Sequence, residues 1–161
     1  MRLPLIGDGG ADWRPVSPLL AVVRRISVTA VLMPLLVVAV FVTAFLTSWA
    51  GIAAGVIGAL WLWLMWLIPR QVEAITWAEL PEELAIRRGR AWRSLVTIPY
   101  GRIQYVDISS GPYLRSKGLA DISVNTASPA SSGEIPGLPV EVAEELRVRL
   151  IAHGEAQRAG L

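Results

Sequence analysis

The sequence predicts an α-helical membrane hairpin of two spans followed by a small α+β domain, a β-barrel or sandwich capped by a C-terminal helix. Three observations predict this fold. Two charge-free apolar runs lie next to each other in the first half of the chain, short alternating apolar runs follow residue 71, and the last segment has a helical apolar period. The chain is 53% hydrophobic, above the usual 45–50% or so of soluble domains.

The two spans are predicted over residues 26–47 and 49–68, neither of which contains a charged residue. About 20 apolar residues cross the roughly 30 Å hydrocarbon core of a bilayer, so each run is long enough. Only Ser48 separates them, which makes the spans antiparallel. The first run is too long for the apolar region of a cleaved signal peptide, and the residues before it carry acids and prolines.

Arginine placement predicts the orientation of the hairpin. Arg24 and Arg25 precede the first span, Arg70 follows the second, and the tip between the spans is uncharged. The positive-inside rule therefore places both termini of a two-pass cell (inner) membrane protein in the cytoplasm. The expected parts are an N-terminal cytoplasmic or interfacial segment (1–25), the hairpin (26–68) and a cytoplasmic domain (71–161).

Small residues in the second span predict a close helix contact. Gly51, Gly55 and Gly58 have the spacing that lets helices approach each other. The favoured interpretation is contact between the two spans of one hairpin, and the alternative is a dimer face. The tryptophans near the end of this span (Trp61, Trp63, Trp66) fit an interfacial belt, or packing between helices. Neither span contains an ionisable residue, which favours an anchor over a transporter.

The second half of the chain predicts one small domain. Short apolar and alternating runs predict strands at residues 72–77, 84–88, 92–98, 102–109 and 120–126. Residues 139–152 repeat apolar side chains at helical spacing, with acids in the first half and arginines in the second, as the helix dipole favours. Gly154 is the expected stop of this helix.

Catalytic and cofactor chemistry finds little support in these residues. There is no cysteine, so thiolate metal sites and cysteine nucleophiles are excluded. His153 is the one histidine, and the sequence contains neither a P-loop nor a G-x-G-x-x-G motif. Ten basic and eleven acidic residues follow Arg70, which does not fit a nucleic-acid-binding domain. We expect no enzyme activity, no metal, no cofactor and no nucleic acid partner.

The densest charge cluster predicts a site of lipid contact. It comprises four arginines and a tryptophan around Gly89, in the expected turn between two strands: Arg87, Arg88, Arg90, Trp92 and Arg93. Basic side chains near an anionic membrane surface each contribute about 1 kcal/mol. The alternatives are a solvated basic turn paired with nearby glutamates, and a protein contact.

One segment carries a family resemblance. Residues 98–106 read IPYGRIQYV and resemble the signature of the bacterial PH-like membrane proteins of the YdbS-like (bPH2) family. The runs at 111–115 (GPYLR), 124–127 (VNTA) and 135–138 (IPGL) are similar to that family as well. The resemblance covers roughly residues 15–150. It implies a PH-like fold on a membrane anchor, and no catalytic residues.

These features favour a non-enzymatic membrane-anchored PH-like module that assembles with another membrane protein. The resemblance points to a multi-span relative carrying similar domains as that partner, and a homo-oligomer is a further option. Exposed strand edges or the groove beside the final helix are the expected contact surface. The alternative function is binding of anionic lipid headgroups at the cytoplasmic face of the membrane.

Overall fold

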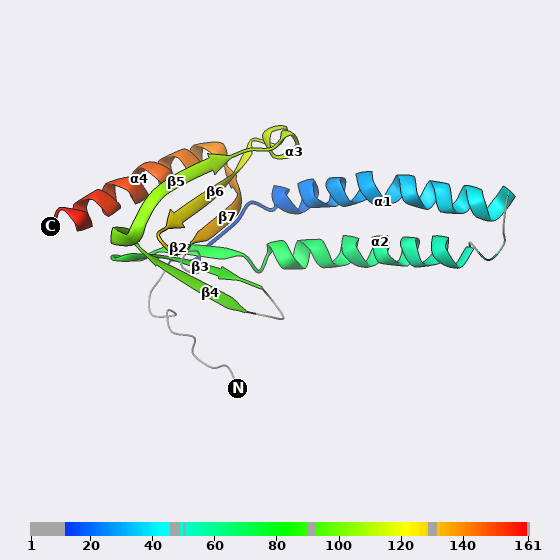
Figure 1. The fold of residues 1–161 in the computed structure, drawn as a ribbon, viewed down its shortest axis with the longest axis horizontal. Helices are drawn as coiled ribbons and strands as arrows, with labels where there is room; N and C mark the ends of the chain where they lie inside the picture. The colour runs from blue at the N-terminus through cyan, green and yellow to red at the C-terminus, as the bar shows by residue number, and fades with distance from the viewer. Residues whose placement is uncertain (1–11, 46–48, 50, 90–92, 129–131, 161) are drawn as a thin grey trace.

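The computed structural model describes residues 12–45, 49, 51–89, 93–128 and 132–160. Two long helices leave one end of a mixed domain side by side, and the final helix runs along the domain away from them (Figure 1). The described chain therefore consists of a helical hairpin at one end and a domain of strands and one long helix at the other.

The hairpin consists of α1 (Leu19–Phe45) and α2 (Gly51–Val72). Both are long and apolar enough to cross a membrane, and their most apolar windows are 0% and 6% buried, unlike the core helix of a soluble protein. Helix α1 begins before the charge-free run and includes Arg24 and Arg25. Helix α2 continues through Pro69, so the predicted strand at 72–77 begins only at Thr76.

The domain has two antiparallel sheets. The first has the order β1-β2-β3-β4, and the second has the order β5-β6-β7. The strands of the first sheet are β1 (Arg14–Pro15), β2 (Thr76–Glu79), β3 (Glu83–Arg88) and β4 (Ser94–Pro99). Those of the second are β5 (Ile103–Ser109), β6 (Leu119–Thr126) and β7 (Gly133–Pro139).

Three helical elements complete the domain. The 3₁₀ helix η2 (Tyr100–Arg102) joins the two sheets, and the short helix α3 (Pro112–Arg115) connects β5 to β6. Helix α4 (Val140–Arg158) contacts β5, β6 and β7 and closes the domain. Its buried side, Ala143, Leu146 and Leu150, confirms the predicted helical period.

Three details differ from the sequence predictions. Gly154 does not stop α4, which continues for another turn and buries Gly154. A bulge between Ile103 and Tyr105 shifts the alternation of β5, so that Val106 is buried and Tyr105 is 59% exposed. Strand β7 was not predicted because Pro136 and Gly137 interrupt it, and both residue types are compatible with an edge strand.

Candidate functional site

The hairpin and the domain share one hydrophobic core. Side chains from the start of α1 and the end of α2 belong to the same buried cluster as the core of the sheets. On the hairpin side this cluster includes Val16, Leu20, Val23, Ile68 and Val72, each exposed by 6% or less. Burying an aliphatic side chain of this size contributes roughly 1.5–3 kcal/mol. The domain is therefore held in a fixed position against the hairpin rather than carried on a loose tether.

At Gly137 in β7, the backbone of the domain closely approaches α1. Its φ is +65°, and a Cβ atom built there would lie 2.7 Å from the Cβ atom of Leu20. The Gly137 carbonyl accepts a hydrogen bond from the Ser17 amide (3.1 Å), and its amide donates to Asp121 Oδ1 (2.7 Å). Only glycine combines this backbone conformation with the close approach of α1, which gives the IPGL run at 135–138 a physical role.

Residues 98–106, the IPYGRIQYV run, connect the first sheet to α4 at the end of the domain away from the hairpin. The Tyr100 hydroxyl donates to the Leu80 carbonyl (2.8 Å), and the Tyr100 ring stacks on His153 of α4 at 5.0 Å. Burial of the ring, and then the charge of Glu79, raise the pKa of Tyr100 to about 12. The hydroxyl therefore stays a neutral donor at physiological pH. The Gly101 amide donates to Gln157 Oε1 (2.7 Å), so Tyr100 and Gly101 both act in packing.

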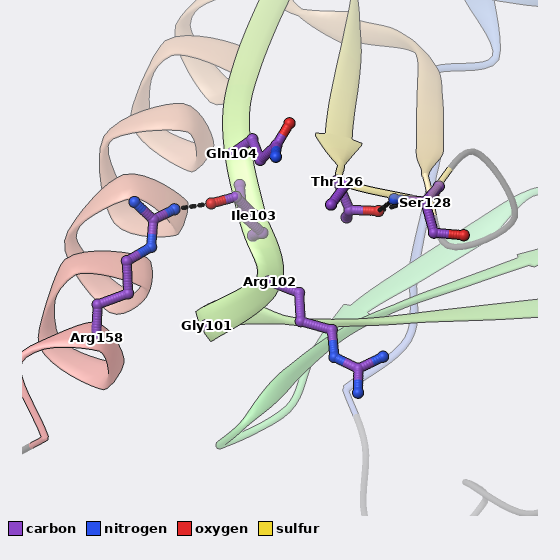
Figure 2. Close-up of a pocket in the computed structure, with 8 residues that line it drawn as sticks. Gly101, Arg102, Ile103, Gln104, Thr126, Ser128 and Arg158 are labelled. Carbon is purple, nitrogen blue, oxygen red and sulfur yellow. Dashed lines mark hydrogen bonds between the residues drawn. The ribbon is translucent and has the colours of Figure 1, made fainter.

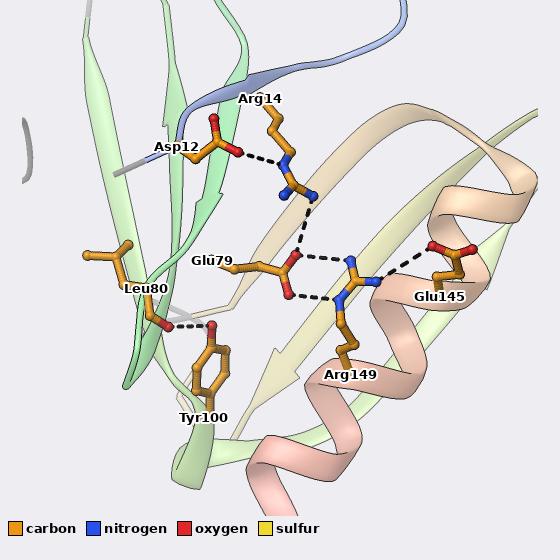
Figure 3. A network of polar contacts seen from close by, with 7 residues as sticks. All are labelled: Asp12, Arg14, Glu79, Leu80, Tyr100, Glu145 and Arg149. Atoms are coloured by element: carbon orange, nitrogen blue, oxygen red, sulfur yellow. Dashed lines mark hydrogen bonds and ion pairs between the residues drawn. The ribbon is translucent and has the colours of Figure 1, made fainter. Parts of the chain in front are cut away.

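A polar network joins α4 to the first sheet on this side (Figure 3). Glu79 accepts two hydrogen bonds of 3.0 Å from Arg149, and it pairs with Arg14 at 3.8 Å. The hydrogen bond to Glu79 raises the pKa of Arg149 above its ordinary value. Arg149 also pairs with Glu145 (3.7 Å) and Arg14 with Asp12 (3.3 Å). Every charge in this network has an opposite charge nearby, so its role is to fix α4 in place.

The arginine cluster around Gly89 is only partly available for lipid contact. The Arg87 guanidinium lies 4.3 Å from the centre of the Trp13 ring, and Arg88 donates a hydrogen bond to the Glu134 carbonyl. Arg93 is exposed. Arg90 and Trp92 lie outside the described residues. The predicted headgroup site therefore keeps Arg93 as its exposed member among the residues that the structure describes.

In the hairpin, the small residues of α2 divide between two sides. A Cβ atom on Gly51 would lie 3.4 Å from Thr43, and one on Gly58 would lie 3.9 Å from Leu36, so both face α1. A Cβ atom on Gly55 would have no neighbouring atom within 4 Å. Gly51 and Gly58 thus fit the interpretation that the two spans meet there, whereas Gly55 lies on the open side of α2.

The tryptophans of α2 also divide. Trp61 donates a hydrogen bond to Thr29 Oγ1 of α1 (3.1 Å), which places it between the helices. Trp63 and Trp66 are 55% and 57% exposed, and the Arg70 guanidinium lies 3.3 Å from the centre of the Trp66 ring. Trp61 therefore packs between the two helices, whereas Trp63 and Trp66 are exposed, as an interfacial belt requires.

A cavity of about 640 Å³ lies where η2 meets the end of β6. It is lined by Arg102 and Arg158, but Figure 2 shows that the two side chains do not converge. Arg158 donates to the Ile103 carbonyl, and Arg102 points away from it. Two guanidinium groups that point apart do not build an anion site. Within the described residues, no group of three His, Cys, Asp or Glu side chains is placed to hold a metal ion.

A groove between β5 and α4 has the features of a protein-binding surface. Its volume is about 210 Å³, and it is lined by Tyr105, Ile151 and the aliphatic floor residue Leu150. Arg147, Glu155 and Arg158 lie around it. Strand β5 pairs with β6 on one side only among the described residues, so its other edge faces this groove. The sequence suggested a groove beside the final helix, but not the exposure of Tyr105, which depends on the bulge.

The comparisons with known proteins agree with this architecture. The family model of the bacterial PH domain matches residues 18–153. The chain belongs to this family. The UPF0699 transmembrane protein YdbS of Bacillus subtilis (strain 168) is 33% identical to it over 145 residues, which are 87% of this chain and 84% of that protein. No solved structure is significantly similar.

The family match begins at the start of α1, so it includes the hairpin as well as the sheets. This extent fits the shared core described above, because the family unit contains both halves of that core. The YdbS-like resemblance predicted from the IPYGRIQYV run is thus confirmed, and the chain is a membrane protein with a bacterial PH domain.

Proposed function

We propose that this bacterial PH domain protein is a non-enzymatic membrane-anchored module that assembles with another membrane protein through the groove between β5 and α4. The observation that supports the proposal is the groove itself, where the edge of β5 that no other described strand pairs with lies beside an exposed aromatic side chain. An extended peptide that adds to such an edge gains main-chain hydrogen bonds, while side-chain pockets select its sequence.

The proposed occupant is an extended segment of a membrane protein in the same bilayer, such as a multi-span relative with PH-like domains. Tyr105 (59% exposed) and Ile151 (37% exposed) provide apolar contact area. Arg147 and Arg158 outnumber Glu155 around the groove, which favours a segment carrying an acidic residue. A partner held in the same membrane meets the groove at a high effective concentration, so even a modest affinity gives a populated complex.

The first experiment purifies the tagged intact chain and its variants from the membranes of its own cells. Tyr105→Glu combined with Ile151→Glu should reduce recovery of the co-purified membrane protein by at least about tenfold, because a charge opposes apolar burial in the groove. Val148→Glu is the matched control, since Val148 is 67% exposed on the same helix and does not line the groove. Equal recovery with all three proteins, or equal loss with Val148→Glu, would contradict the proposal.

We also propose that both termini lie in the cytoplasm and that the membrane is the inner (cell) membrane. Arg24, Arg25 and Arg70 lie at the domain end of the hairpin, while residues 46–51 carry no charge. The chain has no cysteine, so single cysteines report cleanly. In intact cells, a membrane-impermeant maleimide should label Trp49→Cys and leave Glu155→Cys unlabelled until the cells are opened. The reverse pattern would overturn the orientation.

A further inference from the structure

We propose that the α3 face, defined as Tyr113, Arg115 and Lys117, binds the anionic headgroups of the bilayer in which the hairpin lies. This surface differs from the arginine cluster around Gly89 and from the groove that we assign to a protein partner. It would act as a lipid-binding site in addition to the assembly role.

Helix α3 lies beside the hairpin. Helix α3 contacts α1 and lies at the end of the domain from which the hairpin leaves, beside the start of α1 (Figure 1). Leu114 packs against the shared core and fixes the short helix there. Because the core holds the domain against the hairpin, the same surface always faces the membrane.

The start of α1 lies a short distance from the hydrocarbon core of the membrane. Helix α1 begins at Leu19, and its charge-free run begins at Ile26. At 1.5 Å per residue these seven residues span about 10 Å. The headgroup layer of one leaflet is roughly 5–8 Å thick, half of the difference between the total thickness and the hydrocarbon core. The start of α1 therefore lies just outside the headgroup layer, within reach of long basic side chains such as arginine and lysine.

The exposed side chains of the α3 face are of the types that favour an anionic membrane surface. Arg115 and Lys117 are exposed, and neither forms an ion pair with an acidic residue within the described part of the chain. Tyr113 is 51% exposed, and tyrosine is favoured at headgroup depth. Glu141 lies near these basic residues, because the amide of the preceding residue, Val140, donates a hydrogen bond to the Gly118 carbonyl. The negative charge of Glu141 reduces the expected selectivity for anionic lipids.

The test measures which lipids surround α3 in the intact, membrane-inserted chain. A fluorophore on Ser116→Cys is quenched by a nitroxide-labelled phosphatidylglycerol or by the matching nitroxide-labelled phosphatidylcholine, in vesicles of the unlabelled lipids. We expect phosphatidylglycerol to quench about two- to fivefold more effectively at low salt, since Glu141 offsets one of the two basic charges and the remaining one gives roughly a fivefold preference near an anionic surface. The ratio should approach 1 in about 1 M salt, where the Debye length is about 3 Å.

Substitutions test whether the lipid preference depends on the basic residues of the α3 face or on an arginine elsewhere in the domain. Arg115→Glu with Lys117→Glu should abolish the preference, and Arg115→Glu alone should reduce it. Arg102→Glu is the matched control, because Arg102 is equally an exposed arginine but lies in η2, at the far end of β5 from α3. The proposal is overturned by a ratio of 1 in the unaltered protein, by a ratio that the α3 substitutions leave unchanged, or by an equal loss with Arg102→Glu.

Discussion

Replacing Gly137 by alanine should lower the free energy of unfolding of the intact chain by about 2–5 kcal/mol. A left-handed backbone costs a non-glycine residue about 1–2 kcal/mol, and forcing an extra atom into a packed core costs about 1–3 kcal/mol more. Both costs apply here, because φ is +65° and the new Cβ would overlap Leu20. Thermal or denaturant unfolding in detergent, followed by tryptophan fluorescence, measures the loss.

Gly118→Ala is the control for this prediction. Gly118 has nearly the same φ (+64°), but a Cβ there would meet nothing within 4 Å. It should lose about 1–2 kcal/mol, from the backbone conformation alone. The difference between the two variants measures the contact between α1 and β7. Equal losses would show that Leu20 does not press on Gly137 and that the hairpin is not docked there.

Gly154→Leu should have the second large effect, about 1–3 kcal/mol of destabilisation. Gly154 is buried within α4, and a Cβ atom there would lie 3.2 Å from the carbonyl oxygen of Tyr100. A leucine side chain has no space at this contact and would push α4 away from η2, which is the cost of overpacking a core. Unfolding of the purified chain in detergent again gives the magnitude.

Ala152→Leu is the matched control, because Ala152 is exposed on the same helix and receives the same new side chain. Leucine and alanine both favour helix, so this variant should change stability by less than about 0.5 kcal/mol. A small effect of Gly154→Leu, similar to that of Ala152→Leu, would mean that α4 and η2 are not in close contact.

Sequence reasoning found the elements whose pattern is regular. The two charge-free runs predicted both spans, and alternation predicted most of β3 to β6. It left open whether the apolar residues before Arg24 extend the first helix or lie in the headgroup plane, and the structure begins α1 at Leu19. It also misplaced the end of α4, since a glycine that ends a helix and one that allows close packing look alike in sequence.

The interaction surfaces were harder to predict than the fold. The arginine cluster around Gly89 was visible in the sequence, but Arg87 stacks on Trp13, a residue far away in the chain. Lys117 and Arg115 form a smaller cluster, and their position becomes significant only when the shared core places α3 beside the hairpin. The exposure of Tyr105 depends on a bulge that alternation does not reveal.

The measurement that tests the central claim most directly is the depth of two single-cysteine labels in bilayers. The claim is that the shared core fixes one end of the domain at the membrane and holds the other end away from it. With a quencher attached to lipid headgroups, a fluorophore on Ser116→Cys in the segment after α3 should be strongly quenched, and one on Glu155→Cys near the end of α4 should not. Equal quenching at the two positions would show that the domain moves freely on its anchor and would contradict the claim.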